Sequence, residues 1–353
     1  MGFVHIDKTT KDIKFEIAKK PIGAVQWDFL NSLPEAKKSL LEKTEKGPDA
    51  AFIFLSLKCS QKCDNCTIKN INGGECDYKY NDVINILKHL KKIGTSYIIY
   101  DGNSLEHKRF VDILKKTHSL GFQVSVNIEK QITAKDLKLF KKFGVQKVQM
   151  KLYGLNGVQK IYHNNYQVIL DNLKLCKENN LYVSLIFSIT DENYLQIDEY
   201  IKFCEKNSVR QFAFTRLPVC PFCNLKKWPF LNAETFLYVS REIIKHRKTS
   251  KVHITSNEAM WKGCGAATVS CAILPGNLMS PCVYIKHFKK LHGAEEIKNE
   301  WHSTFYKNIR SSAGLKGKCG KCEYNFYCKG CRAIAQLTKN DIFGEDPGCW
   351  IKN

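Results

Sequence analysis

The chain has 353 residues, which allows two domains or one large one. Hydrophobic residues make up 44% and charged residues 25%, a globular composition that excludes a disordered chain. The sequence contains no run of 18 apolar residues, and its start lacks the apolar segment of a signal peptide. We therefore expect a cytoplasmic protein with no membrane span.

The charge is strongly positive, because 55 Lys and Arg outnumber 34 Asp and Glu to give +21. The excess is spread along the chain, with no basic tail or Arg-rich arm. This distribution argues against a dedicated nucleic-acid binder, in which a basic stripe or motif is expected. It is compatible with an anionic substrate or an acidic partner peptide, and equally with a lysine-rich solvated surface.

Hydrophobic patterns alternate along the first two thirds of the chain. Strand-like runs begin near residues 51, 96, 122, 145, 181 and 210, and a helical pattern follows each of them. Six such units predict a parallel sheet covered by helices, either doubly wound or a barrel. Six are fewer than the eight that close a full TIM barrel. The alternation stops after about residue 248, and a segment rich in Gly and Cys follows, in which we expect a hairpin near Gly276.

The sixteen cysteines are clustered, and in a chain without a secretion signal such clusters indicate metal ligands. Cys59, Cys63 and Cys66 form a C-x3-C-x2-C pattern directly after the first strand. In a parallel α/β fold, this is the sheet edge where active sites lie. Three thiolates on one loop can hold three irons of a cubane cluster and leave the fourth iron open. The alternative is a zinc loop that takes a fourth ligand such as Cys76.

This motif in this position resembles the radical S-adenosylmethionine (SAM) enzymes. In that family the open iron of a [4Fe-4S] cluster binds SAM, whose reductive cleavage yields a 5′-deoxyadenosyl radical. The resemblance implies a partial (β/α)6 TIM-type barrel over residues 51–248, preceded by an N-terminal extension over residues 1–50.

The resemblance also suggests which residues bind SAM. The family's Gly-Gly-Glu-Pro stretch after the second strand corresponds here to Asp101-Gly102-Asn103-Ser104. Asp101 or Asn103 would accept a hydrogen bond from the SAM ammonium, and Lys151, at the end of the fourth strand, would meet the SAM carboxylate. Arg216, at the end of the sixth strand, is expected to face the same cavity, with a surface or packing role as the alternative.

A second group of cysteines lies near the end of the chain, and eight thiolates are enough for two further cubanes. The sequence around these cysteines, with the segments GCRA and EDPGC, resembles the SPASM extension of radical SAM enzymes. This resemblance predicts a SPASM domain over residues 249–353. The resemblance implies an auxiliary [4Fe-4S] cluster I on Cys264, Cys271, Cys282 and Cys331. It implies an auxiliary cluster II on Cys319, Cys322, Cys328 and Cys349. The gap between Cys328 and Cys331 is two residues, where three is usual.

A zinc ribbon is the alternative for this second group. It would use Cys319, Cys322, Cys328 and Cys331. It leaves the other four cysteines of the group unexplained.

Five cysteines remain outside these sets. Cys220 and Cys223, after the sixth strand, are candidates for a catalytic hydrogen donor or for metal ligation, with two packed thiols as the alternative. Cys176 and Cys204 lie inside helical patterns and are expected in the core. Cys76 is open to either role.

The resemblance implies an enzyme that abstracts hydrogen from, and modifies, a ribosomally made peptide or protein. An acidic leader on that substrate would suit the positive charge of the chain. A reductant such as flavodoxin or ferredoxin would be its redox partner. The alternative is oxidative decarboxylation of a haem or tetrapyrrole side chain. From a different class, a non-catalytic iron–sulfur electron carrier or binding protein stays open.

Overall fold

The computed structural model describes residues 45–58, 76–155, 166–218, 222, 228–256, 259, 263–325 and 328–351. In this part of the chain, the strands form a single sheet in the order β10-β9-β8-β1-β2-β3-β4-β5-β6-β7. Seven consecutive parallel strands make up most of it. They are β1 (Ala50–Phe54), β2 (Tyr97–Asp101), β3 (Gln123–Ile128), β4 (Val145–Leu152), β5 (Val183–Ser188), β6 (Gln211–Thr215) and β7 (His253–Ser256).

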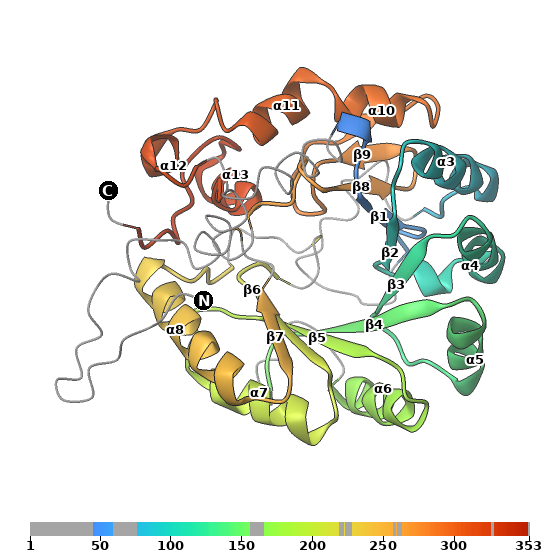
Figure 1. The fold of residues 1–353 in the computed structure, drawn as a ribbon, viewed down its shortest axis with the longest axis horizontal. Helices are drawn as coiled ribbons and strands as arrows, with labels where there is room; N and C mark the ends of the chain where they lie inside the picture. The colour runs from blue at the N-terminus through green and yellow to red at the C-terminus, as the bar shows by residue number, and fades with distance from the viewer. Residues whose placement is uncertain are drawn as a thin grey trace.

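Helices connect these parallel strands and lie along the outer side of the curved sheet (Figure 1). They are α3 (Tyr80–Lys92), η3 (Ser104–Glu106), α4 (Phe110–Ser119), α5 (Ala134–Lys142), α6 (Tyr166–Glu178), η5 (Tyr194–Gln196), α7 (Ile197–Lys206) and α8 (Ala233–Thr249). The helices expected from the apolar spacing of the sequence are confirmed. In α3, for example, the buried residues are Val83, Ile86, Leu87 and Leu90. None of the described helices is long and apolar enough to cross a lipid bilayer.

A hairpin extends the opposite edge of the sheet. Strand β8 (Ser270–Leu274) pairs in parallel with β1 and in antiparallel with β9 (Leu278–Ser280), which in turn pairs with β10 (Lys289–Lys290). The turn that we expected near Gly276 is present, and both Gly276 and Asn277 adopt positive φ, which glycine and asparagine tolerate best. Four short helices follow: α10 (Glu296–Trp301), α11 (Thr304–Ser311), α12 (Gly317–Lys321) and α13 (Arg332–Lys339).

The six predicted strand–helix units are all present. We expected the strand–helix alternation to end near residue 248, and this is wrong because one further parallel strand follows. Strand β7 continues the parallel sheet beyond residue 248. Strand β7 has only four residues, of which Ile254 and Ser256 are buried. It is too short for the alternation of buried and exposed residues to be recognised in the sequence. The hairpin also belongs to this same sheet, through the pairing of β8 with β1.

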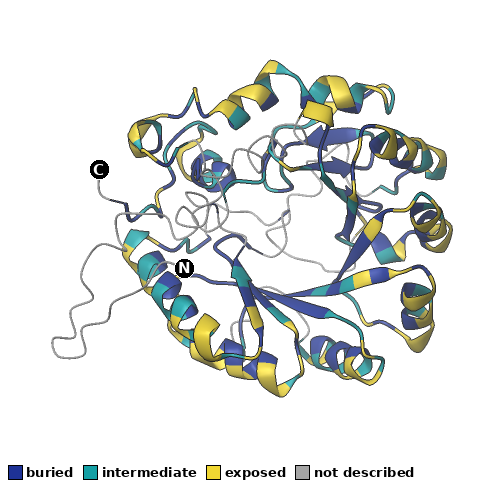
Figure 2. Ribbon diagram, viewed as in Figure 1, coloured by how far each residue is buried: buried dark blue, intermediate teal, exposed yellow. Residues whose placement is uncertain are grey.

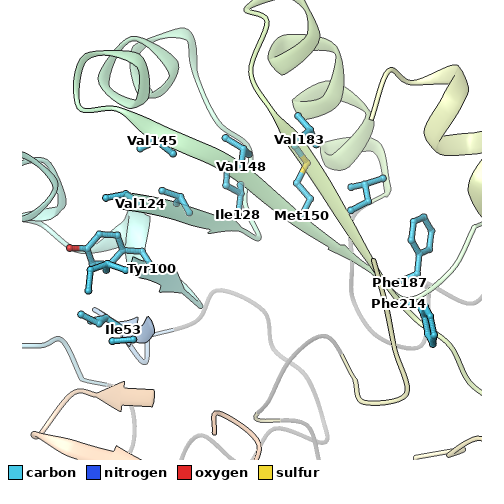
Figure 3. Packing of buried hydrophobic residues seen from close by; sticks show 14 of the residues in the cluster. Ile53, Tyr100, Val124, Ile128, Val145, Val148, Met150, Val183, Phe187 and Phe214 are labelled. Atoms are coloured by element: carbon cyan, nitrogen blue, oxygen red, sulfur yellow. The ribbon is translucent and has the colours of Figure 1, made fainter. Parts of the chain in front are cut away.

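The main hydrophobic core lies between the sheet and its outer helices. Buried residues of β1 to β6 point into this layer (Figure 3), and the helices expose their opposite faces to solvent (Figure 2). In β3 and β4 the outward residues are Val124, Val126, Ile128, Val148, Met150 and Leu152. The intervening residues of these strands are polar and point to the inner side, where a closed barrel ordinarily holds an apolar core. The inner side is therefore suited to hold a ligand.

Candidate active site

The residues that flank the three-cysteine segment after β1 lie next to each other. Cys59, Cys63 and Cys66 lie outside the described residues, but the residues on either side of that segment contact each other. The Leu57 N–H donates to the Cys76 carbonyl at 2.8 Å, and Lys58 Nζ lies 2.7 Å from an oxygen of Asp77. Both ends of the loop are therefore fixed at the carboxyl end of β1, where the first cluster is expected.

The stretch that follows β2 packs directly against the start of that loop. Gly102 has a φ of +60°, and a Cβ there would lie 2.8 Å from the Phe54 ring, so glycine is required on both counts. Asn103 Nδ2 donates to the Lys58 carbonyl at 2.7 Å. The residues predicted to hold the SAM ammonium thus lie beside the residue that precedes Cys59.

Lys151 and Asp101 form a buried ion pair at the carboxyl ends of β4 and β2. Lys151 Nζ lies 2.7 Å from Asp101 Oδ1 and 3.4 Å from Glu129 Oε1. Burial raises the pKa of Glu129, and the charge of Asp101 adds to that rise, while Lys151 opposes it. Our sequence reasoning missed Glu129, although it continues, just after β3, the alternation of the polar residues Ser125 and Asn127. Two carboxyl groups and one ammonium form a site suited to a zwitterionic group.

A cavity of about 350 Å³ joins these groups to the C-terminal cysteines. Asp101 and Lys151 line it from the barrel, and Cys264, Cys282 and Cys331 line it from the C-terminal part of the chain. Three of the four thiols expected at auxiliary cluster I therefore border the same space as the candidate SAM residues. Cys271, the fourth, is buried on β8 and does not border the cavity.

A second, separate hollow lies within the C-terminal segment. Its lining includes all four thiols expected at auxiliary cluster II, which are Cys319, Cys322, Cys328 and Cys349. Cys331, the fourth ligand of the alternative zinc ribbon, does not line this hollow and borders the barrel cavity instead.

Burial affects the chemistry of these thiols. It raises the pKa of Cys271, Cys282 and Cys349 to about 12, and raises the pKa of Cys328 well above its ordinary value. As free thiols, these groups would stay protonated at neutral pH. A bound cationic metal centre would favour their thiolate form, so the donor set fits an iron–sulfur cluster.

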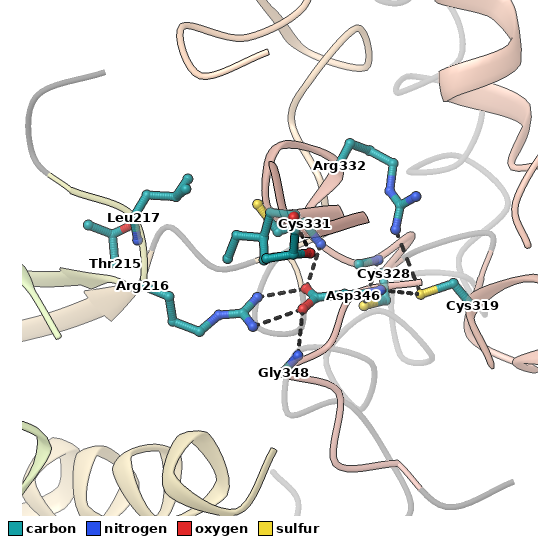
Figure 4. A network of polar contacts seen from close by, with 12 residues as sticks. Thr215, Arg216, Leu217, Cys319, Cys328, Cys331, Arg332, Asp346 and Gly348 are labelled. Carbon is teal, nitrogen blue, oxygen red and sulfur yellow. Dashed lines mark hydrogen bonds and ion pairs between the residues drawn. The ribbon is translucent and has the colours of Figure 1, made fainter. Parts of the chain in front are cut away.

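Arg216 does not face the cavity, and our expectation that it would is wrong. Neighbouring Thr215 and Leu217 line the cavity, while the Arg216 guanidinium binds both oxygens of Asp346 at 2.9 and 2.7 Å (Figure 4). It also lies 4.2 Å from the ring centre of Phe236 on α8. Because side chains alternate along the chain at the end of β6, Arg216 turns away from its two neighbours and joins the barrel to the C-terminal segment.

Asp346, which the sequence did not single out, connects the two cysteine sites. Its Oδ2 accepts a hydrogen bond from the Cys331 N–H at 2.8 Å, and its own N–H donates to Cys319 Sγ at 3.4 Å (Figure 4). Burial alone would raise its pKa, but Arg216 and two backbone N–H donors outweigh burial and hold the pKa below its ordinary value. Asp346 therefore carries a negative charge between the two sites.

The remaining predicted thiols divide into two groups. Cys220 and Cys223 lie outside the described residues, so the structure does not describe their surroundings. Cys176 and Cys204 are fully buried in the main core, as predicted. Cys76 is partly exposed, and its carbonyl group accepts the hydrogen bond that closes the cysteine loop.

Comparison with known proteins identifies the first part of this fold. Residues 53–204 match the Radical SAM superfamily. The chain therefore contains a radical SAM domain, the domain of a superfamily of enzymes. The matched radical SAM region begins within β1 and ends in α7, so it contains the cysteine loop, Asp101, Glu129 and Lys151.

Two curated relatives share parts of the sequence, and both are named AdoMet-dependent heme synthase. The protein of Methanosarcina barkeri is 34% identical over 93 residues, which cover 26% of this chain and 27% of the relative. That of Nitratidesulfovibrio vulgaris is 24% identical over 194 residues, which cover 47% of this chain and 53% of the relative. The matches thus span about a quarter and about half of the length of these relatives.

A radical SAM fold of this kind is also known from crystallography. The structure of Streptococcus suis SuiB bound to its precursor peptide SuiA has a TM-score of 0.68 and 16% sequence identity. The superposition covers 90% of this chain and 80% of SuiB. At this identity the likeness concerns the fold, and it extends through both the barrel and the C-terminal segment.

Proposed function

We propose that the chain uses a 5′-deoxyadenosyl radical to abstract hydrogen from, and modify, a ribosomally made peptide or protein. One observation carries the proposal: two of the candidate SAM residues, Asp101 and Lys151, border a single cavity of about 350 Å³ together with the cysteines Cys264, Cys282 and Cys331. A substrate in that cavity would lie between a site for SAM and a site for a second redox centre.

Cys59, Cys63 and Cys66 would hold the cluster that binds SAM, and reductive cleavage of bound SAM supplies the radical. Lys151 would bind the SAM carboxylate, and Asp101 would accept from its ammonium group, with Gly102 and Asn103 shaping the backbone beside them. A zwitterion placed between Lys151 and Asp101 would exchange their mutual ion pair for two new ones. Both side chains are already buried, so water competes weakly for these contacts.

We further propose that residues 249–353 form a SPASM domain with two auxiliary [4Fe-4S] clusters on the two predicted ligand sets. The lining of the second hollow by Cys319, Cys322, Cys328 and Cys349 supports this assignment. Among the described residues, no three His, Cys, Asp or Glu side chains converge closely enough to hold a single metal ion. Four thiols around a hollow match the wider spacing of a cubane better than that of one zinc ion.

A tetrapyrrole is the second candidate substrate. It is favoured by sequence, because both curated relatives described above are named AdoMet-dependent heme synthase. The reaction would be an oxidative decarboxylation of a side chain. SuiB, whose structure contains a precursor peptide, favours the peptide candidate through its fold alone. In either case a small electron donor such as flavodoxin or ferredoxin would act as the reductant.

The test begins with anaerobic reconstitution of the full chain. Three cubanes would give about twelve irons per chain, and the dithionite-reduced protein should release 5′-deoxyadenosine from SAM. A variant with Cys59, Cys63 and Cys66 all changed to Ala should keep about eight irons and release none. Cys76→Ala is the matched control, because a zinc loop that used Cys76 would lose its metal, whereas a cubane on the other three would not.

Two outcomes would contradict the proposal. Wild-type protein that holds its iron but releases no 5′-deoxyadenosine would instead be an electron carrier or a binding protein. About four irons per chain would remove the auxiliary clusters. The substrate class is tested by the neighbouring reading frames, where a short precursor peptide supports the peptide candidate and haem-pathway genes support the tetrapyrrole.

A further inference from the structure

The inner side of the barrel carries polar residues along the strands as well as at their carboxyl ends, which form the rim of the cavity. Residues that line the cavity occupy successive positions on neighbouring strands: Ser125 is paired in register with Lys147, and Asn127 with Gln149. Lys147 precedes the rim residue Lys151 by four positions on β4. The side chain of Lys147 therefore borders the end of the cavity that lies away from the candidate SAM residues.

Lys147 differs from Lys151 in having no counterion among the described residues. Lys151 is paired with Asp101 and Glu129, whereas Lys147 makes no ion pair or hydrogen bond with any residue that the structure describes. Burial lowers the pKa of Lys147, and no described carboxylate opposes that effect. A partly buried cation is costly unless an anion accompanies it, so this position favours a negatively charged ligand.

The groups around Lys147 suit a carboxylate. The hydroxyl of Tyr97, on β2, is hydrogen-bonded to the hydroxyl of Ser125, on β3. Both residues line the cavity, and β3 is the strand that pairs with β4, on which Lys147 lies. Among the described lining residues the only acid is Asp101, which is bonded to Lys151. One of the two hydroxyls donates to the other, which leaves one hydroxyl hydrogen free. A lysine without a described counterion and one free hydroxyl donor match the single charge and two oxygens of a carboxylate.

We propose that Lys147, together with Tyr97 and Ser125, binds a carboxylate group of the substrate inside the barrel. The identity of the carboxylate bearer rests on the proposed function: it is an acidic side chain of a peptide or a propionate of a tetrapyrrole. In either case the carboxylate would hold the substrate at the inner end of the cavity, with its remaining part directed toward the rim.

The test compares probes that differ only in the carboxylate. Binding to the anaerobically reconstituted holoprotein is measured by calorimetry for coproporphyrin III and its tetramethyl ester. The same is done for a hexapeptide with a central Glu and its Gln counterpart. At least one acidic probe should bind ten or more times tighter than its neutral partner, and the pair that shows this preference identifies the source of the carboxylate.

Variants then locate the preference. Lys147→Met should reduce it to within twofold while the neutral probe binds as before, and Lys147→Arg should restore most of it. Lys138→Met, on the exposed face of α5, is the matched control that removes the same charge from the protein. If Lys147→Met does not fold, Ser125→Ala, which removes only one donor, should lower the preference two- to fivefold.

Three results would overturn the proposal. These are a wild-type protein without carboxylate preference for either probe pair, a preference that persists in Lys147→Met, and a tenfold loss of SAM affinity in Lys147→Met. The third would assign the lysine to the SAM carboxylate. A wild-type protein that makes no 5′-deoxyadenosine would contradict the proposed function, while the probe measurements would still decide the role of Lys147.

Discussion

Two buried ion pairs with the same shortest distance lie near the carboxyl end of the sheet. Arg216 and Asp346 approach to 2.7 Å, and so do Lys151 and Asp101. In the first pair both oxygens of Asp346 are occupied by the guanidinium and by two backbone N–H groups. Neither residue lines the barrel cavity, although Asp346 lines the second hollow. In the second pair both side chains border the cavity, and a third charged group, Glu129, has a raised pKa.

The comparison shows that burial of a charged pair does not by itself mark a ligand site. A closed network, in which every polar atom has a partner, holds segments of chain together. A network that borders a cavity can exchange its partners for those of a ligand. The two pairs should therefore respond differently to mutation.

The largest effect is expected for the closed pair. Arg216→Met leaves Asp346 as a buried, uncompensated carboxylate, which should lower the free energy of unfolding by about 3–5 kcal/mol. Urea unfolding of the anaerobic holoprotein measures it. Arg210→Met is the control, because Arg210 is exposed and its guanidinium contacts the Asn180 side chain and the Tyr182 ring without any described carboxylate. Equal effects of the two variants would show that the Arg216 pair has no special structural role.

For the open pair, the main loss should be in ligand affinity. Lys151→Met would remove the proposed charge-assisted hydrogen bond to the SAM carboxylate, worth about 1.5–3 kcal/mol, or roughly 10- to 150-fold in SAM affinity. Its effect on unfolding should be smaller than that of Arg216→Met, because water in the cavity can solvate Asp101. Calorimetry with SAM measures the affinity, and Lys138→Met again serves as control. A variant that unfolds as readily as Arg216→Met and binds SAM normally would reverse the two assignments.

The smallest effect concerns the pH dependence of stability. A carboxyl group with a raised folded-state pKa contributes stability that is present below its unfolded pKa of about 4.3 and is lost as the pH rises through the folded value. Wild-type protein should therefore lose stability relative to Glu129→Gln as the pH rises from about 4. The charges that act on Glu129 are Lys151, Asp101 and Glu106. A stability difference between wild type and Glu129→Gln that does not change with pH would contradict the raised pKa.

The sequence was sufficient for features that depend on local periodicity. Strands that were expected near 51, 96, 122, 145, 181 and 210 begin at Ala50, Tyr97, Gln123, Val145, Val183 and Gln211. The alternation of apolar and polar residues also places Lys151 and Asp101 on the inner side. Lys151 was singled out through the family resemblance, and its place in the cavity lining agrees because that place depends only on which face of one strand is inward.

Features that depend on contacts between distant segments could not be predicted in the same way. Arg216 follows Thr215, which is inward, and one position decides whether a side chain enters the cavity or leaves it. Its partner, Asp346, lies 130 residues later, and no spacing rule relates the two. The role of Asp346 between the two cysteine sites likewise arises only when the C-terminal segment folds against β6.

The pairing of β1 with β8 has a consequence for how the chain is made. Ala51 lies beside Cys271, so the first described strand to leave the ribosome acquires its second neighbour only after about 220 further residues. At about 5–20 residues per second, synthesis of that length takes roughly 10 to 45 s. Until then β1 presents a free edge to other nascent chains. We therefore expect the yield of soluble protein to depend on chaperones and on translation speed more than on the stability of the finished fold.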